Sequence, residues 1–337
     1  GDENEGRDMS ERIAIIGDTG CRAEEGDPFQ ACNDPTAWPF AAIAAQVAAY
    51  EPDLIISVHP LMQDVPLRVL RRMGRHVPVI TVVTDLGTFH PTWFHRGVTL
   101  CFVPTASGYR EALRRGLSQR QLRQHGLPIR PEFGVPSPPR ADVRRALGLV
   151  SHLPNVLLIG GGEGMGPVAK IARAVAGELA AVGEPRGQLS VVCGRNEKLR
   201  AKLLEMPWPV PTAVHGYVDN MWDLMAASDC IITKAGPGTI AESMARGLPM
   251  VLSGYLMGQE EGNVSYVLEN GVGAYSDDPH RIAAVVGRWF GAERETLDLL
   301  ARRARAIGTA DAAFRIADDI AALVRAEAGM ALEAAGL

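Results

Sequence analysis

Short apolar runs alternate with amphipathic stretches along most of the chain, a pattern typical of parallel α/β folds. In the first half, apolar runs predict strands at residues 12–16, 52–58, 77–83 and 99–103. Between them, helical periodicity predicts helices at residues 36–50, 64–74 and 105–116. The apolar runs are too short for helices, so we expect strands that are buried on both faces of a sheet.

The same alternation restarts in the second half. Predicted strands cover residues 155–159, 189–193, 214–218, 229–233 and 249–252, and predicted helices begin at 168 and 239 and cover 311–326. The proline-rich stretch Pro136–Pro139 indicates a stiff linker between the halves. The sequence therefore predicts an α/β protein with two doubly wound, Rossmann-like domains facing a cleft.

The predicted domain organisation has four parts. We expect residues 1–11 to be disordered, 12–135 to form a shortened N-terminal domain, 136–150 to form a linker, and 151–337 to form the C-terminal domain. The last helix is expected to pack back across the domains. With 337 residues in total, each half is long enough for a hydrophobic core of its own.

The stretch Ser228–Asn263 carries the strongest candidate chemistry. Its strand ends in Ala235-Gly-Pro-Gly-Thr239, where glycines let a phosphate approach the backbone and the next helix offers free N–H groups. Glu242, expected in the first turn of that helix, suits ribose hydroxyls, and the amides and carboxylates of the predicted loop 254–263 suit a sugar. An ordinary strand-to-helix turn is the alternative interpretation.

A second glycine-rich turn lies at residues 160–166, after a predicted strand and before a helix, which is the context of a phosphate cradle. It has no Gly-Lys-Ser/Thr for a P-loop and no well-placed acid for a dinucleotide, which argues against an ATPase or a dehydrogenase. Another strand leads into Gly194-Arg-Asn196, and the predicted strand Val214–Val218 ends where a base can bind.

Residues 84–95 are the other chemically rich stretch. Asp85, His90, Trp93 and His95 follow a predicted parallel strand, at the edge where α/β folds place ligands. They are suited to act as a general base and an aromatic platform for an acyl or sugar group. A packed loop with its histidines bonded to backbone is the alternative. No metal is expected, because these side chains do not form a recognised ligand set.

Composition is that of a soluble globular protein. Hydrophobic residues make up 47% and charged residues 22% of the chain, and no run is long enough to span a membrane. No signal peptide or other targeting segment is visible. The five cysteines lack CxxC spacing, so we expect reduced thiols in place of a zinc site or a disulfide framework.

The net charge of −5 conceals an asymmetry. Residues 1–60 hold 12 acids against 3 arginines, whereas residues 61–130 hold 11 arginines against 3 acids. Arginines beside apolar residues on predicted helices are typical of a surface that meets anionic lipid, although a solvated helix face explains them equally well. Nucleic acid is not expected as a partner, because no aromatic residues interleave with the arginines.

Several multi-residue motifs together resemble one family. They are HPLMQDVPLRVLR (59–71), TDLGTFHPTWFH (84–95), GLPIRP (126–131), GGGEGMGP (160–167), CGRN (193–196), DCIITKAGPGTIAES (229–243), GLP (247–249) and GQEEGN (258–263). Over residues 52–326 the chain is similar to the plant-type monogalactosyldiacylglycerol synthases, inverting GT-B glycosyltransferases related to the peptidoglycan N-acetylglucosaminyltransferase. The resemblance implies transfer of galactose from UDP-galactose to the free hydroxyl of 1,2-diacylglycerol, with inversion and without a cofactor.

The resemblance also implies a peripheral membrane protein that meets diacylglycerol and anionic lipid, at the cytoplasmic face of a bacterial membrane or at a chloroplast envelope. From the motifs and the resemblance together, the residues expected to bind the donor are Arg130, Gly162, Glu163, Gly164, Met165, Gly166, Arg195, Asn196, Tyr217, Val218, Gly236, Gly238, Thr239, Glu242, Gln259, Glu260 and Asn263. Those expected to meet the acceptor or the membrane are His59, Arg68, Arg71, Arg72, Trp93 and Phe94. Among the donor residues, Glu242 is expected to bind the ribose, and Gln259 with Glu260 the galactose.

The chain departs from the family pattern in two places. Asp18-Thr-Gly-Cys-Arg22 stands where the family has a glycine-rich loop whose histidine is the proposed catalytic base, and Glu261 replaces a small residue. Residues 12–56 resemble the opening of a bacterial metallophosphoesterase instead. The candidate bases are therefore His90 and Asp85, in the stretch after the third predicted strand.

Two other functions remain open at this point. The protein is a UDP-sugar-binding protein without catalysis if no other residue replaces the missing histidine. A metal-dependent phosphoesterase that uses Asp18 and Asn33 is the less favoured alternative, because the continuation that such a metal site needs is replaced by residues 57–63.

Overall fold

The computed structural model describes residues 13–16, 37–164, 166–180 and 184–334. Within this part of the chain, the molecule divides into two compact units. Unit 1 holds the residues before 85, residues 89–125 and those from 318 onward, whereas unit 2 holds residues 85–88 and 126–317. The segment predicted to be disordered, residues 1–11, lies outside the described residues.

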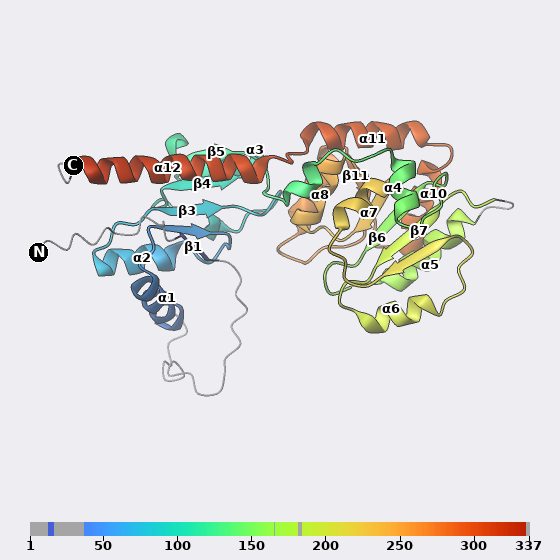
Figure 1. Cartoon of the computed structure of the whole chain (residues 1–337), viewed down its shortest axis with the longest axis horizontal. Helices are drawn as coiled ribbons and strands as arrows, with labels where there is room; N and C mark the ends of the chain where they lie inside the picture. The colour runs from blue at the N-terminus through green and yellow to red at the C-terminus, as the bar shows by residue number, and fades with distance from the viewer. Residues whose placement is uncertain (1–12, 17–36, 165, 181–183, 335–337) are drawn as a thin grey trace, which may run out of the picture. The chain divides into compact units, whose positions relative to one another are not determined.

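Unit 1 contains a parallel sheet with the strand order β1-β2-β3-β4-β5 (Figure 1). Its elements are β1 (Ile13–Ile16), α1 (Ala37–Tyr50), β2 (Leu54–Ser57), α2 (Asp64–Met73), β3 (Val79–Val82), η2 (Pro91–Trp93), β4 (Leu100–Val103), α3 (Ala106–Arg114), η3 (Gln119–Gln121) and β5 (Leu122–Gln124). Every residue of β3 and β4 is buried, as expected for central strands of a parallel sheet.

Helix α2 shows how the sequence sets local structure in unit 1. Asp64 in its first turn and two arginines in its last turn complement the helix dipole. Val69 and Leu70 are buried, whereas the arginines are exposed. Gly74 ends the helix with a φ of 65°, a left-handed conformation that glycine adopts without strain. The helix therefore packs one face on the unit and presents a basic face outward.

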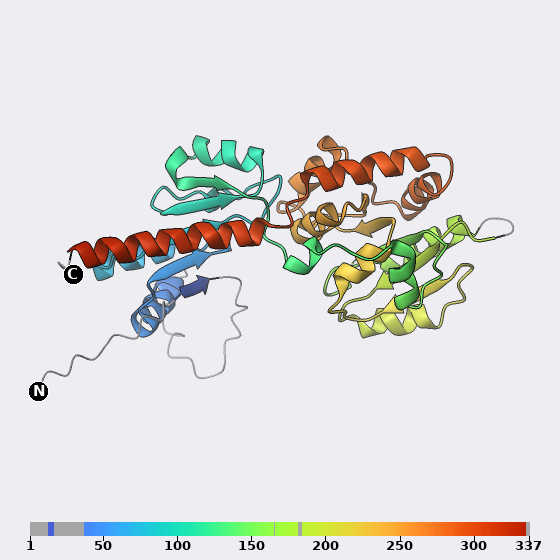
Figure 2. The same cartoon turned by 45° about the horizontal axis from the view of Figure 1, so that its top comes forward.

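The last helix, α12 (Ala312–Ala334), belongs to unit 1 from residue 318 onward. Its Asp319 carboxylate lies 2.7 Å from Nε2 of His125 and 3.6 Å from Nε of Arg123, both at the end of β5. Figures 1 and 2 show α12 alongside the sheet of this unit in two views. The predicted helix 311–326 is thus present and is longer than expected.

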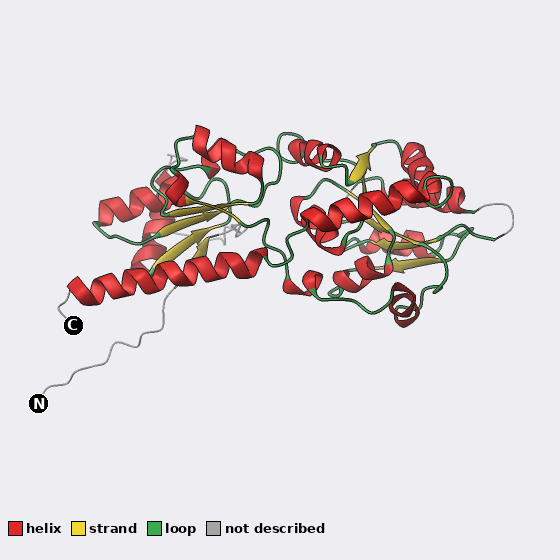
Figure 3. Cartoon of the chain, turned by 90° about the horizontal axis from the view of Figure 1, so that it is seen from above, coloured by secondary structure: helices red, strands yellow, loops and turns green. Residues whose placement is uncertain are grey.

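Unit 2 contains a parallel sheet with the strand order β11-β10-β9-β6-β7-β8, flanked by helices (Figure 3). Its strands are β6 (Asn155–Ile159), β7 (Gln188–Val192), β8 (Thr212–His215), β9 (Cys230–Thr233), β10 (Met250–Leu252) and β11 (Gly273–Tyr275). The chain leaves β6 toward β7 and β8 on one side, and β9 pairs with the other side of β6. A topological switch point therefore lies between β6 and β9.

The helices of unit 2 follow the same alternation. They are η4 (Pro131–Gly134), α4 (Arg140–Ala146), α5 (Val168–Leu179), α6 (Glu197–Leu204), α7 (Met221–Ala227), α8 (Pro237–Arg246), α9 (Glu261–Glu269), α10 (Pro279–Trp289) and α11 (Arg294–Ile307). Helix α5 shows the pattern best, because it buries an apolar face at helical spacing. That face consists of Val168, Ile171, Ala172, Val175, Ala176 and Leu179.

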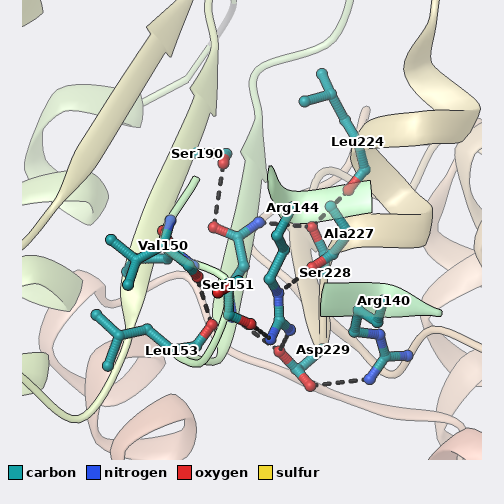
Figure 4. A network of polar contacts seen from close by, with 12 residues as sticks. Arg140, Arg144, Val150, Ser151, Leu153, Ser190, Leu224, Ala227, Ser228 and Asp229 are labelled. Carbon is teal, nitrogen blue, oxygen red and sulfur yellow. Dashed lines mark hydrogen bonds and ion pairs between the residues drawn. The ribbon is translucent and has the colours of Figure 1, made fainter. Parts of the chain in front are cut away.

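A buried ion pair ties α4 to the amino ends of β6 and β9 (Figure 4). The carboxylate of Asp229 accepts the backbone N–H of Asn155 at 2.8 Å, pairs with the guanidinium of Arg144, and lies 2.9 Å from Nη1 of Arg140. The side-chain amide of Asn155 donates to the Ser228 hydroxyl at 2.8 Å. This network holds the sheet together at the edge opposite the carboxyl ends of its strands.

The boundary between the units differs from the predicted domain boundary. The chain crosses into unit 2 at residues 125–126, ahead of the predicted limit at residue 135. Residues 136–150, predicted as a linker, include α4, whose Arg144 is 6% exposed. The prolines at 136–139 predict a linker, and buried polar contacts made by an arginine leave no local signal in the sequence that would oppose that prediction.

Two predicted element boundaries near the carboxyl edge of the sheet are wrong. Helix α8 begins at Pro237, so Glu242 lies in its second turn and not in its first. A proline at the first helical position needs no N–H partner there, which favours this earlier start. Helix α9 begins at Glu261, inside the segment predicted as a loop.

A third boundary differs at β8. The strand ends at His215, before Gly216, whereas the prediction continued it to Val218. None of the described helices is long and apolar enough to cross a membrane. Cys101, Cys193 and Cys230 are buried free thiols, and the other two cysteines lie outside the described residues.

Candidate functional site

A cavity of about 170 Å³ lies in unit 2 at the carboxyl edge of the sheet. Its lining residues are Arg130, Ile159, Gly161, Gly162, Val192, Gly194, Tyr217, Val218, Met221, Thr239 and Glu242. They end or follow β6, β7 and β8, lie in α7 and α8, or, in the case of Arg130, directly precede η4. The cavity therefore occupies the switch point between β6 and β9, where parallel α/β sheets bind ligands.

Two loops that pack on each other form part of the cavity wall. One follows β6 (residues 160–166) and the other follows β7 (residues 193–196). The N–H of Arg195 donates to the carbonyl of Gly162 at 2.8 Å, and a Cβ at Gly194 would lie 2.2 Å from the same oxygen. Gly194 also has a φ of 58°, so another residue would strain both loops.

Asn196 braces these loops and does not line the cavity. Its Nδ2 donates to the carbonyl of Gly164 at 3.3 Å, and its Oδ1 accepts the N–H of Leu199 at 2.9 Å, which caps α6. The sequence analysis placed Asn196 in contact with the donor. Because both ends of its amide bind protein, we assign it the role of positioning the glycine loop.

The amino end of α8 borders the cavity. Gly236 is its N-cap residue, and Thr239 in its first turn lines the cavity. The first N–H groups of a helix have no partner within the helix, and the helix dipole places partial positive charge there. Together with the backbone of Gly161 and Gly162, this end of α8 is suited to bind a phosphate group.

Glu242 supplies the titratable group of the cavity. Burial raises the pKa of its carboxyl from 4.5 to about 7, and the positive charge of Arg130 acts in the opposite direction. A carboxylate in this place can accept hydrogen bonds from two neighbouring ligand hydroxyls, such as those of a ribose. The hydroxyls of a bound ligand would then replace the contacts with water that the Glu242 carboxyl loses through burial.

Aromatic rings hold the two arginines of the site. The guanidinium carbon of Arg130 lies 5.5 Å from the ring centre of Phe133 and 5.2 Å from that of Trp222. The guanidinium carbon of Arg195 lies 4.8 Å from the ring centre of Tyr217. Such cation–π contacts fix long side chains at modest cost. Tyr217 is 58% exposed, so its ring remains accessible at the cavity.

The predicted sugar-binding residues Gln259 and Glu260 have different surroundings, and neither lines the cavity. Gln259 is exposed. Glu260 is 4% exposed, forms an ion pair with Lys234, and accepts the N–H of Leu256 at 3.0 Å. Lys234 is not among the residues predicted for the site. The available sequence signal is a lysine directly after a buried strand.

Asn263 is fully buried, and its side chain binds protein at both ends. Its Oδ1 accepts the N–H groups of Leu86 and Gly87, each at 3.2 Å, and its Nδ2 donates to the carbonyl of Ala235 at 2.9 Å. This corrects the predicted contact between Asn263 and the sugar. The residue instead joins the turn after β9 to the segment 85–88.

Close backbone packing explains why residues 85–88 belong to unit 2. A Cβ at Gly87 would lie 1.9 Å from the carbonyl oxygen of Gly262, and a Cβ at Gly262 would lie 2.0 Å from Oγ1 of Thr88. Leu86 is 2% exposed and packs in the apolar core of this unit. Two glycines are thus needed where the segment crosses the start of α9.

The two candidate bases lie in different units. Asp85 is in the segment 85–88 of unit 2 and is 8% exposed, whereas His90 is exposed on unit 1. Nδ1 of His90 lies 2.6 Å from Oγ1 of Thr92 and accepts the N–H of Thr92 at 3.4 Å. The Nδ1 side of the His90 ring is thus bonded within its own loop, as the packed-loop interpretation expects.

The prediction of an aromatic platform in the same stretch is wrong. Trp93 is 1% exposed and Phe94 is 6% exposed, and both belong to the core of unit 1. Of the other residues predicted to meet the acceptor or the membrane, His59 accepts the N–H of Leu61 at 3.2 Å. The three arginines of that set are exposed on α2. They are Arg68, Arg71 and Arg72.

The remaining predicted residues do not line the cavity or lie outside the described residues. Those that do not line it are Glu163, Gly164, Gly166, Arg195, Gly236 and Gly238. Met165, Asp18 and Asn33 are outside the described residues. In the part of the chain that the structure describes, no group of three or more His, Cys, Asp or Glu is arranged to hold a metal ion.

Comparison with known proteins agrees with this geometry. Residues 24–129 match the family model described as monogalactosyldiacylglycerol (MGDG) synthase, and residues 155–278 match the glycosyltransferase family 28 C-terminal domain. A probable monogalactosyldiacylglycerol synthase, chloroplastic, from Nicotiana tabacum is 50% identical over 287 residues, which cover 84% of this chain and 54% of the relative. Monogalactosyldiacylglycerol synthase 1, chloroplastic, from Arabidopsis thaliana is 49% identical, with the same coverage.

Among solved structures, MurG of Acinetobacter baumannii superimposes with a TM-score of 0.59 at 14% identity, over 83% of this chain and 76% of that one. The fold, with its cavity at the switch point, is that of the GT-B class of glycosyltransferases. The chain belongs to the monogalactosyldiacylglycerol synthase family, as the motifs over residues 52–326 indicated.

Two features of the match bear on function. The chain spans about half the length of the curated relatives that it matches. The first family model begins at residue 24, so residues 24–56 match monogalactosyldiacylglycerol synthase, which corrects the predicted resemblance of this part of 12–56 to a metallophosphoesterase opening.

Proposed function

We propose that the protein transfers galactose from UDP-galactose to the free hydroxyl of 1,2-diacylglycerol with inversion, giving monogalactosyldiacylglycerol. The observation that carries the proposal is the 50% identity over 287 residues with a relative that bears the name of this synthase. The cavity of unit 2 supports it, because its lining suits each part of a nucleotide sugar. The proposed reaction needs no cofactor besides the sugar donor.

The donor is proposed to lie across the carboxyl edge of the sheet. The uracil would bind beside Tyr217 and Val218, and the ribose hydroxyls would donate to Glu242. The diphosphate would then reach the glycine loop and the amino end of α8, where backbone N–H groups and the helix dipole favour anions. This order leaves the galactose toward Gln259, which is exposed and accessible to a sugar.

The transfer needs a base and groups that stabilise the leaving diphosphate. The acceptor oxygen forms a bond to C1 of galactose while the bond from C1 to the diphosphate oxygen breaks, and the hydroxyl proton passes to the base. Asp85 is the first candidate base, because its segment packs on α9 within the unit that carries the cavity. His90 is the second candidate.

We further propose that unit 1 meets anionic lipid as a peripheral protein. Arg71 of α2 and the nearby Arg75 line a second cavity of about 450 Å³, together with the apolar residues Leu67, Leu70 and Val77. Basic groups beside apolar ones suit a lipid interface. The proposed locations are the cytoplasmic face of a bacterial membrane or a chloroplast envelope.

The test is transfer of labelled galactose from UDP-galactose to diacylglycerol in mixed micelles that contain anionic lipid. A labelled galactolipid that depends on both substrates supports the proposal. Micelles without diacylglycerol are the control. The variants Asp85→Asn and His90→Gln test the two candidate bases. Full activity of Asp85→Asn would exclude Asp85 as the base, and full activity of His90→Gln would exclude His90.

One result would favour the alternative function. The first histidine of the sequence is His59, so the histidine of the family's glycine-rich loop has no counterpart in residues 1–58. If the folded protein binds UDP-galactose but gives no product, it is a UDP-sugar-binding protein without catalysis.

A further inference from the structure

Lys234 lies between the two backbone turns that border the cavity. It follows β9 directly, and a Cβ at Gly236 would lie 3.2 Å from its Nζ. On the other side, a Cβ at Gly161 would lie 3.5 Å from its Cε. Gly161 lines the cavity, and Gly236 is the N-cap of α8. The ammonium group therefore adjoins the place where a diphosphate would bind.

Glu260 holds that ammonium group in place. The carboxylate is 4% exposed, and its second oxygen accepts the N–H of Leu256 at 3.0 Å, which fixes its orientation. The Lys234 side chain is 35% exposed, and an ammonium has three N–H donors. The ion pair with Glu260 uses one donor, so the others remain available to a ligand on the accessible side.

The other cations of the site are held by aromatic rings. Arg130 packs against Phe133 and Trp222, and Arg195 packs against Tyr217 while its Nη1 lies 3.1 Å from the carboxylate of Glu163. These contacts place both arginines beside the proposed positions of the uracil and the ribose. Lys234 is the cation that lies between the glycine loop and α8.

We propose that Lys234 contacts the diphosphate of a UDP-sugar and stabilises the negative charge that remains on UDP when the sugar leaves. This deepens the proposed function and rests on it. When C1 of the sugar bonds to the acceptor oxygen, the electron pair of the broken bond stays on the β-phosphate oxygen. A cation held next to that oxygen stabilises it without having to move during the reaction.

The test compares UDP with uridine as ligands in isothermal titration calorimetry, without sugar or acceptor. In Lys234→Met, UDP affinity falls about tenfold or more, because a charge-assisted hydrogen bond is lost, whereas uridine affinity stays within about twofold. Lys234→Arg restores most of the UDP affinity. The matched control is Lys202→Met, which removes an exposed lysine of α6 and leaves both affinities unchanged.

The design separates the contact from effects on folding. Lys234→Met leaves the Glu260 carboxylate without its cation, so the double variant Lys234→Met/Glu260→Gln is measured as well and is expected to show the same selective loss of UDP. Equal losses of UDP and uridine, or unchanged UDP affinity, would overturn the proposal. Absence of galactosyl transfer to diacylglycerol tests the proposed function alone, because the binding comparison uses no acceptor.

Discussion

The carboxyl group of Glu242 is the group that we propose binds the ribose of the donor. Its raised pKa means that near neutral pH the free protein holds this group in both protonation states. Ribose hydroxyls that donate hydrogen bonds bind the ionised form better, because both oxygens of a carboxylate accept, whereas a protonated carboxyl group uses one oxygen as a donor. Binding of a nucleotide sugar should therefore release a proton and depend on pH.

We expect the affinity for UDP-galactose to rise by up to about tenfold between about pH 6 and pH 8, as Glu242 ionises. UDP-galactose is a suitable ligand, because its diphosphate diester does not titrate in this range. In Glu242→Gln the affinity should be lower and independent of pH. Calorimetric titrations at several pH values make the comparison, and an unchanged slope in the variant would contradict the assignment.

The same pKa has a consequence for stability. Below the unfolded value of 4.5 both states hold the proton, and between 4.5 and about 7 only the folded state holds it. The folded protein binds more protons in this interval, so its free energy of unfolding should decrease as pH rises through it.

Asn263 illustrates a residue whose role follows from burial. We expect Asn263→Ala to lower the free energy of unfolding by about 1–3 kcal/mol, because it removes the acceptor of two N–H groups and the donor to Ala235. Chemical denaturation measures this change. Hydrogen exchange should also show faster exchange at the amides of Leu86 and Gly87.

The matched control for Asn263 is Asn270→Ala. Asn270 is the exposed C-cap residue of the same helix, and its side chain donates to the carbonyl of Tyr266 at 2.8 Å. Its substitution should leave stability and the exchange of residues 85–88 unchanged. Equal effects of the two variants would show that Asn263 does not hold the segment.

At the scale of elements, the strands and glycine turns were predictable, because each leaves a local pattern. The run 155–159 and the helix start at Val168 match the structure residue for residue. The attachment of residues 85–88 to α9 was not predictable. It depends on a hydrogen bond between residues 177 positions apart, and local periodicity carries no information about such a contact.

The functional site shows the same division. The glycine loops and Glu242 were predictable from the strand–glycine–helix pattern, and Thr239 was assigned from the family resemblance. The burial of Trp93 was missed, because an aromatic residue in a polar stretch has the same sequence signature whether it faces solvent or the core. Lys234 was missed because its position between two turns depends on how β6 and β9 pair.

The ion pair at the opposite edge of the sheet stabilises the framework of unit 2. We expect Asp229→Ala to lower the free energy of unfolding by about 3–5 kcal/mol, because it leaves the buried guanidinium of Arg144 without its partner. Asp298→Ala is the control. It removes an exposed carboxylate 3.7 Å from Arg294 and should change stability by less than about 1 kcal/mol. Thermal or denaturant unfolding measures both changes. An equal loss of unfolding free energy in the two variants would show that the buried ion pair does not stabilise unit 2.

At the scale of the whole molecule, charge is divided between segments of the chain. The basic block, residues 61–130, lies mostly in unit 1, and α2 exposes part of it. Unit 2 carries the cavity that we propose binds the nucleotide sugar. This division accords with a protein that binds a soluble donor with one unit and a lipid surface with the other.

We expect the triple variant Arg68→Gln, Arg71→Gln, Arg72→Gln to lose much of its binding to vesicles that contain anionic lipid. Each basic residue near such a surface contributes about 1 kcal/mol at low ionic strength. The control removes three exposed arginines of unit 2, Arg281, Arg302 and Arg315, by the same substitution. Vesicle co-sedimentation measures both, and equal losses would show that total charge matters and α2 does not.

The central claim is that this chain makes a β-galactolipid from UDP-galactose, and the most direct test is the structure of the product. Proton NMR of the lipid recovered after incubation with UDP-galactose and diacylglycerol identifies both the sugar and its anomeric configuration. The account predicts a single galactose in β linkage to the glycerol hydroxyl, formed by the natural sequence and strongly reduced in Glu242→Ala. Unmodified diacylglycerol, recovered from a folded protein that binds UDP, would contradict it.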